Sequence, residues 1–216
     1  MIHNILGLFA TTEVFIYVFA ELIVHIESVR RALLRTASRH DLLLLAALFG
    51  AFSIFGTYTG IELPGGAISS IRDLGPLVAG LVAGPLVGLG AGLIGGVQRY
   101  FMGGFTAIPC GLATILAGVV GGLIYLINKK KLISIGYAIL AAIFVEVLHG
   151  VLALLIARPF DDALQVVYTA IPAMMVANGM GIAIFVIILE HAIKELKTAR
   201  QTQAESKAGG SGDAAG

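Results

Sequence analysis

Arg99 and the glycine-rich connection that follows it are the residues best placed to bind a ligand. The run Arg99-Tyr-Phe-Met-Gly-Gly-Phe-Thr106-Ala-Ile-Pro-Cys110 predicts a broken helix entry, where free backbone N–H groups favour an anion. An arginine at membrane depth costs about 2.5 to 3.5 kcal/mol on insertion scales, and its planar fork suits a carboxylate. We therefore expect Arg99, the Thr106 hydroxyl and Cys110 to hold a small carboxylate. The alternative is that Arg99 extends to lipid phosphates.

Arg72 and Asp73 form a second charged feature, which is either a neutralised pair or a second ligand for the anion. Arg72 and Arg99 are 27 residues apart, so one straight helix would separate them by about 40 Å at a rise of about 1.5 Å per residue. The two arginines can share a site only if the chain bends back between them. The candidate break points are Pro76, Gly84-Pro85 and the polar stretch before Arg72.

Three further polar residues lie within apolar segments. Glu146 and His149 are three residues apart, on one face of a helix, and Asn178 lies in the following segment. Buried polar residues of this kind usually make hydrogen bonds between helices, which is the structural interpretation. A proton-sensing or ligand-binding role is the alternative.

Metal, cofactor and enzymatic signatures are missing from the sequence. Cys110 is the only cysteine, and no group of cysteines or histidines has metal-ligand spacing, so we expect no metal and no cofactor. There is no P-loop, no G-x-S-x-G elbow and no H-E-x-x-H motif, so we expect no enzymatic activity. The net charge of +1, without a basic aromatic stretch, predicts no nucleic-acid partner.

The composition places these residues in a lipid bilayer. Of 216 residues, 58% are apolar and only 12% are charged, against roughly 25% charged residues in a typical soluble domain. A helix needs about 20 mostly apolar residues to cross the hydrocarbon core, and segments of that kind fill the chain. The six segments are Ile5–His25, Asp41–Tyr58, Leu74–Gln98, Thr106–Ile127, Leu132–Ala157 and Val167–Ile193. We therefore predict an all-α membrane protein, a bundle of about six transmembrane helices.

Three regions follow from this pattern. Residues 1–40 combine a retained N-terminal helix with a basic segment at the membrane surface, in which leucines alternate with arginines at helical spacing. Residues 41–193 form a membrane domain of five helices. Residues 194–216 begin as a helix extension and end in Gly-Gly-Ser-Gly-Asp-Ala-Ala-Gly, which predicts a disordered tail.

Glycine recurs at every fourth residue of the third segment, at Gly80, Gly84, Gly88, Gly92 and Gly96. Positions i and i+4 share one side of a helix, so a neighbouring backbone can pack closely on this strip. Gly118 and Gly122 form a matching pair in the fourth segment. We predict that the third and fourth segments are in contact and that Gly88→Leu destabilises the fold. Lining a pore is the alternative role of the strip.

The numbers of basic residues on the two predicted membrane sides differ little, so they indicate the orientation of the chain only weakly. Six crossings put both termini on one side, and if that side is cytoplasmic, eight basic residues lie inside: Arg72, Lys129, Lys130, Lys131, Lys194, Lys197, Arg200 and Lys207. Six then lie outside: Arg30, Arg31, Arg35, Arg39, Arg99 and Arg158. The excess favours cytoplasmic termini, although the basic stretch 30–39 argues against this orientation. A re-entrant segment at residues 60–70 would change the parity.

Six ordered motifs resemble the five-transmembrane receptor domain of LytS-type sensor histidine kinases, the 5TMR-LYT family. They are Ser70-Ile-Arg-Asp-Leu-Gly75, Val78-Ala-Gly-Leu-Val-Ala-Gly-Pro-Leu-Val-Gly88, Arg99-Tyr-Phe-Met-Gly-Gly-Phe-Thr-Ala-Ile-Pro-Cys-Gly111, Thr114-Ile-Leu-Ala-Gly118, Ala157-Arg-Pro-Phe-Asp-Asp-Ala163 and Pro172-Ala-Met-Met-Val-Ala-Asn178. The resemblance covers residues 41–193 and implies a receptor in the plasma membrane of a prokaryote, which senses an extracellular small molecule. Pyruvate-like carboxylates are the ligand class of some members. The family also looks distantly similar to the substrate-capture subunits of vitamin transporters.

The resemblance also implies a set of ligand-binding residues. In pyruvate-sensing relatives the ligand is thought to depend on two arginines, a cysteine and a serine. The matching positions here are Arg72, Arg99 and Cys110, whereas Ala113 stands at the serine position and the adjacent Thr114 is the candidate hydroxyl. The expected ligand set, drawn from the residues and from the resemblance, is Arg72, Arg99, Thr106, Cys110 and Thr114.

Family members usually continue into a histidine kinase or a diguanylate cyclase, whereas only a short polar segment follows the last predicted helix here. We therefore expect a receptor that signals through a separate histidine kinase, diguanylate cyclase or other cytoplasmic output protein, with an excised domain as the alternative. Whether the receptor is a monomer or a homodimer stays open. A transport component that resembles a substrate-capture subunit is the second functional hypothesis.

Overall fold

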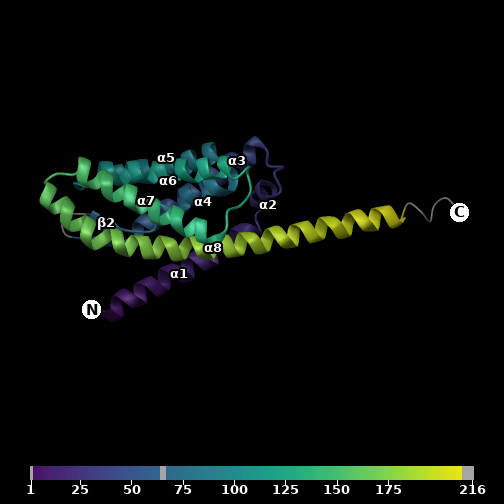
Figure 1. The fold of residues 1–216 in the computed structure, drawn as a ribbon, viewed down its shortest axis with the longest axis horizontal. Helices are drawn as coiled ribbons and strands as arrows, with labels where there is room; N and C mark the ends of the chain where they lie inside the picture. The colour runs from purple at the N-terminus through teal and green to yellow at the C-terminus, as the bar shows by residue number, and fades with distance from the viewer. Residues whose placement is uncertain (1, 64–66, 211–216) are drawn as a thin grey trace.

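The computed structural model describes residues 2–63 and 67–210, which form an elongated helical bundle from which one long helix extends (Figure 1). The elements, in chain order, are α1 (Ile2–Val24), α2 (Glu27–Leu33), α3 (Arg39–Tyr58), β1 (Ile61–Leu63), β2 (Ala67–Ser69), α4 (Leu74–Ala83), α5 (Pro85–Phe101), α6 (Ala107–Ile127), α7 (Ile135–Ile156) and α8 (Phe160–Gly210). The two short strands pair antiparallel and connect α3 to α4.

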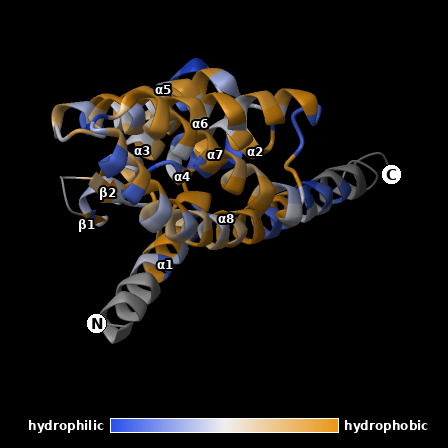
Figure 2. Ribbon diagram, turned by 60° about the vertical axis from the view of Figure 1, so that its left-hand side comes forward, coloured by the Kyte–Doolittle hydropathy of each residue, from blue (hydrophilic) through white to orange (hydrophobic). Residues whose placement is uncertain are grey.

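Long apolar helices make up the bundle, as the sequence predicts. Within the described residues, α3, α6, α7 and α8 are long and apolar enough to cross a membrane. α1 packs against α8, and the 17-residue α5 packs against both α3 and α6. Hydrophobic residues cover most of these helices in Figure 2, and hydrophilic residues gather where α8 leaves the bundle. The predicted all-α membrane bundle is confirmed.

Phenylalanine side chains pack α1 against the rest of the bundle. The ring centroids of Phe19 and Phe52 are 4.4 Å apart, and those of Phe52 and Phe185 are 5.7 Å apart. These residues come from α1, α3 and α8, so one aromatic cluster joins three helices that are distant in the sequence. Aromatic pairs of this kind add about 0.5 to 1.5 kcal/mol beyond the area they bury.

The third predicted segment is two helices rather than one. The chain folds back at Gly84, so the predicted continuous crossing from Leu74 to Gln98 is wrong. Gly84 has a φ angle of +95°, which side-chain-bearing residues rarely adopt. Pro85 begins α5, where its missing N–H removes no hydrogen bond from the helix. Of the candidate break points, Gly84-Pro85 is the one at which α4 turns into α5.

Glycines let α6 approach both arms of the α4–α5 hairpin. A Cβ atom added at Gly80 would lie 2.5 Å from the carbonyl oxygen of Gly118 and 2.5 Å from the nitrogen of Gly122. A Cβ atom added at Gly88 would overlap the same Gly118 carbonyl group. The predicted contact between the third and fourth segments is therefore confirmed. The glycine strip, however, is divided between two helices that both rest on α6.

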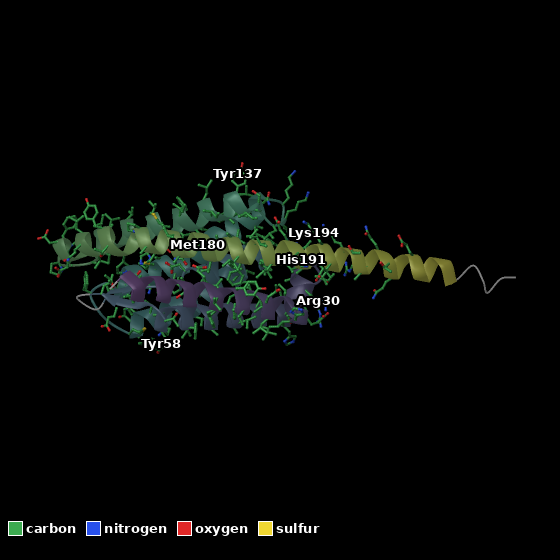
Figure 3. All side chains as sticks on the ribbon, turned by 90° about the horizontal axis from the view of Figure 1, so that it is seen from below. Arg30, Tyr58, Tyr137, Met180, His191 and Lys194 are labelled. Atoms are coloured by element: carbon green, nitrogen blue, oxygen red, sulfur yellow. The ribbon has the colours of Figure 1, made fainter. Side chains whose placement is uncertain are left out.

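The three basic segments lie at one end of the bundle. The predicted division of the basic residues, eight on one side of the membrane and six on the other, is therefore corrected. The Arg35 guanidinium lies 4.6 Å from the centre of the Tyr125 ring and donates a hydrogen bond to the Val82 carbonyl oxygen. Arg30 and Arg200 line one groove between α2 and α8. Figure 3 labels Arg30 and Lys194 at this end. The predicted division was wrong because α4 is an additional short segment that runs back against α5. This extra reversal also places the two ends of the chain at opposite ends of the bundle (Figure 1).

The last helix is longer than the sequence predicts. α8 runs from Phe160 to Gly210, so the helix extension predicted from residue 194 is present and continues to Gly210. Residues 211–216 lie outside the described residues. α8 therefore connects the core of the membrane bundle to its basic end and extends beyond it (Figure 1).

Candidate functional site

Two arginines lie inside the bundle, at matching depths on the two arms of the hairpin. Arg72 directly precedes Asp73, the N-cap residue of α4, and Arg99 lies in the last turn of α5; both are 0% exposed. Because α4 and α5 run in opposite directions from Gly84, both residues come within electrostatic range of the Cys110 side chain and of each other. The chain thus bends back between Arg72 and Arg99, as a site shared by the two arginines requires.

Arg99 is held by the connection between α5 and α6. Its Nη1 donates to the carbonyl oxygen of Gly103 at 2.7 Å, and its Nη2 donates to the Thr106 hydroxyl at 3.0 Å. Arg99 therefore points into the protein rather than to lipid phosphates. Among the described residues, its Nε atom has no hydrogen-bond partner. One donor of a fixed guanidinium is thus left for another group.

Arg72 has more unused donors than Arg99. Its Nη1 donates to the Ser70 hydroxyl at 3.0 Å, and its Nε lies 3.8 Å from Asp73 Oδ1, which is an ion-pair distance but too long for a hydrogen bond. In the part of the chain that the structure describes, neither Nε nor Nη2 of Arg72 has a hydrogen-bond partner. Buried donors without partners are costly, so this guanidinium is suited to an added acceptor.

A small cavity lies next to the Arg72 segment. Its volume is about 50 Å³, and its lining residues include Ser69, Ser70 and Ile71, together with Gly56, Thr59 and Met174. Ser70, which accepts the hydrogen bond from Arg72, thus faces both the cavity and the guanidinium. The cavity lies beside the β1–β2 hairpin, at the end of the bundle opposite the basic segments (Figure 1).

Cys110 and Thr114 lie one turn apart in the first half of α6. The Sγ atom of Cys110 lies 3.2 Å from His149 Nε2, and the thiol is buried. The Thr114 hydroxyl is within hydrogen-bond distance of Asp73 Oδ1 at 2.6 Å and of the Cys110 carbonyl oxygen at 3.0 Å. Its single proton is therefore used within the protein, and Thr114 orients Asp73 rather than presenting a free donor.

A carboxylate and imidazole cluster adjoins the arginines. Asp73 Oδ2 lies 3.0 Å from His149 Nδ1, which in turn lies 3.5 Å from Glu146 Oε2. Asn178 of α8 donates its Nδ2 hydrogen to Glu146 Oε1 at 2.8 Å. The predicted hydrogen bonding between helices is confirmed: Glu146 and Asn178 join α7 to α8, and His149 and Cys110 join α7 to α6.

All five predicted ligand residues are buried, and their side chains form two groups of polar contacts. Arg99 bonds Thr106, whereas Thr114 bonds Asp73, the neighbour of Arg72, and Cys110 contacts His149. The sequence did not group Asp73 with Glu146 and His149, because Asp73 begins α4 and the other two residues belong to α7. The one local signal was the spacing of Glu146 and His149, which placed them on one face. Ser70 begins one of the family motifs, but the sequence alone did not predict that it accepts a hydrogen bond from Arg72.

Comparison with known proteins identifies the family. The protein-family model described as "5TMR of 5TMR-LYT" matches residues 26–192. The chain is 31% identical over 205 residues to "Sensor protein LytS" of Bacillus cereus, an alignment that covers 87% of this chain and 34% of that protein. It is 32% identical over 217 residues to "Sensor protein LytS" of Bacillus subtilis, covering 93% of this chain and 36% of that protein.

A third relative is named as a histidine kinase. The chain is 37% identical over 147 residues to "Sensor histidine kinase BtsS" of Escherichia coli strain K12, with 66% of this chain and 26% of that protein covered. The chain thus spans about a third or less of the length of these relatives. No solved structure matches it significantly, so the similarity to vitamin-transporter subunits stays a prediction. The chain is a multi-pass membrane sensor domain of the bacterial inner membrane, and it belongs to the 5TMR-LYT family.

Proposed function

We propose that this domain senses a small extracellular carboxylate of the pyruvate type and passes its occupancy to a cytoplasmic output protein such as a histidine kinase. The observation that carries the proposal is the pair of fully buried arginines near Cys110, which keep N–H donors without a hydrogen-bond partner in the described part of the chain. Two buried cations with one neighbouring carboxylate at 3.8 Å leave positive charge uncompensated locally. A bound carboxylate would compensate it and accept the free hydrogen bonds.

The charge distribution supports an external ligand. Basic residues at the end formed by α2, the α6–α7 connection and the extension of α8 favour a cytoplasmic position for that end. Arg99 follows Pro85 by 14 residues, which is about 21 Å along α5 from the basic end. Arg99 therefore lies in the outer half of the bundle, on the same side as the cavity next to Ser70.

α8 is the element best placed to pass on a change. Asn178 connects it to Glu146, which belongs to the cluster that includes Asp73, the residue next to Arg72. From Asn178, the helix continues through the basic end without a break. A ligand that binds one arrangement of this cluster more tightly would shift the position of α8 by that difference in affinity. The name of the Escherichia coli relative, a sensor histidine kinase, supports a histidine kinase as the output.

A ligand panel on the purified chain tests the proposal. We expect pyruvate or a similar carboxylate to raise the melting temperature, because ligand at 100 times its Kd adds about 2.7 kcal/mol to stability. Arg99→Ala should remove the shift, and Arg99→Lys should weaken it, since lysine lacks the bidentate fork. Arg158→Ala, an exposed arginine at the same end, is the matched control and should keep the shift.

Two results would refute the sensor proposal. One is the absence of any carboxylate-dependent shift in a wild-type protein that melts cooperatively. The other is accumulation of labelled carboxylate in proteoliposomes that contain this chain alone, which would indicate a transport component instead. A variant enters the comparison only when its melting temperature without ligand shows that it is folded.

A further inference from the structure

The cluster formed by Asp73, Glu146 and His149 has a property that hydrogen bonding between helices does not explain. One polar atom of each side chain approaches the other two residues at ion-pair distance, at 3.0 Å and 3.5 Å from His149 Nδ1, without an aligned hydrogen bond among the described residues. Among the described residues, Asp73 Oδ2, Glu146 Oε2 and His149 Nδ1 make no hydrogen bond, and the three residues are 0 to 3% exposed. The three ligand atoms all lie within 4.8 Å of one another. Burial of three such atoms without partners is costly unless something joins them.

The other polar atom of each side chain is already held from outside the cluster. The Thr114 hydroxyl donates to Asp73 Oδ1, and the Asn178 amide donates to Glu146 Oε1. His149 Nε2 lies 3.2 Å from Cys110 Sγ. Partners of this kind orient metal ligands and select the histidine tautomer. A hydrogen on Nε2, directed at the sulfur, leaves the lone pair of Nδ1 free toward the carboxylates.

We propose that Asp73, Glu146 and His149 bind a divalent transition-metal ion of the zinc type, with Asp73 Oδ2, Glu146 Oε2 and His149 Nδ1 as the ligand atoms. Nitrogen and oxygen ligands lie about 2.0 to 2.2 Å from such an ion. Two ligand atoms are then about 3.0 Å apart at a right angle and about 3.4 Å apart at a tetrahedral angle. The two separations that involve His149 Nδ1 are 3.0 Å to Asp73 Oδ2 and 3.5 Å to Glu146 Oε2, and one ligand atom of each residue lies within 4.8 Å of the other two. Asp73 Oδ2 is within hydrogen-bond distance of Nδ1 but makes no aligned hydrogen bond with it.

The charges and the local sequence agree with this site. Two carboxylates and a neutral imidazole carry a charge of −2, equal and opposite to that of the ion. With the ion bound, the charges of the buried Arg72 and Arg99 are left for the carboxylate ligand of the proposed function to compensate. Arg72 approaches Asp73 at Oδ1, which also accepts the hydrogen bond from Thr114. The other oxygen, Oδ2, is the one that would bind the ion. A Glu-x-x-His pair on one helix is the arrangement by which helical bundles present metal ligands to their interior. The sequence predicted no metal because the third ligand, Asp73, comes from a distant helix.

The experiment measures metal in tag-free purified protein, with no carboxylate present. After chelator treatment and dialysis, Zn²⁺ is added, excess ion is removed, and the metal content is determined by mass spectrometry. We expect one Zn²⁺ per chain. His149→Gln and Glu146→Gln should each lower the affinity for Zn²⁺ more than tenfold, and Asn178→Ala should lower it about 10- to 100-fold, as loss of an outer partner does.

One variant controls for binding at another site. His191→Gln removes an exposed histidine that lies 3.2 Å from Glu195 and could bind zinc adventitiously on the surface. This variant should keep one Zn²⁺ per chain. X-ray absorption on the wild-type protein should show nitrogen and oxygen ligands without sulfur, which tests the site even if the cluster variants fail to fold.

Three results would overturn the metal site. They are a wild-type protein that binds no Zn²⁺ above background, a stoichiometry that falls in His191→Gln but not in the cluster variants, and a sulfur ligand in the absorption spectrum. The first result would mean that the three atoms share a proton instead of an ion. Because the metal measurement contains no carboxylate, its failure leaves the test of the sensor proposal unaffected.

Discussion

The packing of α4 against α6 predicts a large response to one added methyl group at Gly80. A Cβ atom there would lie 2.5 Å from the Gly118 carbonyl oxygen, 2.5 Å from the Gly122 nitrogen and 2.8 Å from the Gly121 carbonyl carbon. All three are backbone atoms, so no side-chain rotation can make room. Ordinary contacts begin near 3.4 Å, so the helices must separate by roughly 1 Å, which costs about 1 to 3 kcal/mol.

For a chain of this size, that cost corresponds to a fall in melting temperature of about 2 to 12 °C for Gly80→Ala. The chain has no tryptophan, but Cys110 is its only cysteine and is buried. A maleimide dye that fluoresces on reaction with a thiol therefore reports unfolding in detergent. Gly136→Ala is the matched control, because a Cβ atom added at Gly136 meets no atom within 4 Å. Equal melting temperatures for the two variants would refute the packing argument.

Two further predictions concern the basic end. Arg35→Ala should lower stability by about 1 to 2 kcal/mol, because it removes the stacking on Tyr125 and the hydrogen bond to Val82, whereas the exposed Arg39→Ala should change thermal stability little. For orientation, we expect a membrane-impermeant maleimide to label Asp161→Cys but not Lys131→Cys on intact cells, each in a Cys110→Ser background. The reverse labelling pattern would contradict the assignment of the basic end to the cytoplasm.

The sequence by itself determined the class of fold and the kinds of residue at the site. Apolar runs of membrane-spanning length predict helices without reference to any partner, because lipid requires each segment to satisfy its own backbone hydrogen bonds. Glycine periodicity likewise predicted the contact with α6, which the approach of Gly80 and Gly88 to Gly118 confirms. Arg99 stood out from its position alone, because an arginine within an apolar segment is costly to place at membrane depth.

Only the tertiary structure decided how these parts are combined. Gly84-Pro85 was one of several break points, and whether two helices continue or fold back depends on the surface of α6 that receives them. The reversal placed Arg72 near Arg99 and put the segment with Arg35 at the same end as the other basic segments. The meeting of Asp73 with His149 was equally hidden, because contacts between distant helices follow from packing and leave no local spacing in the sequence.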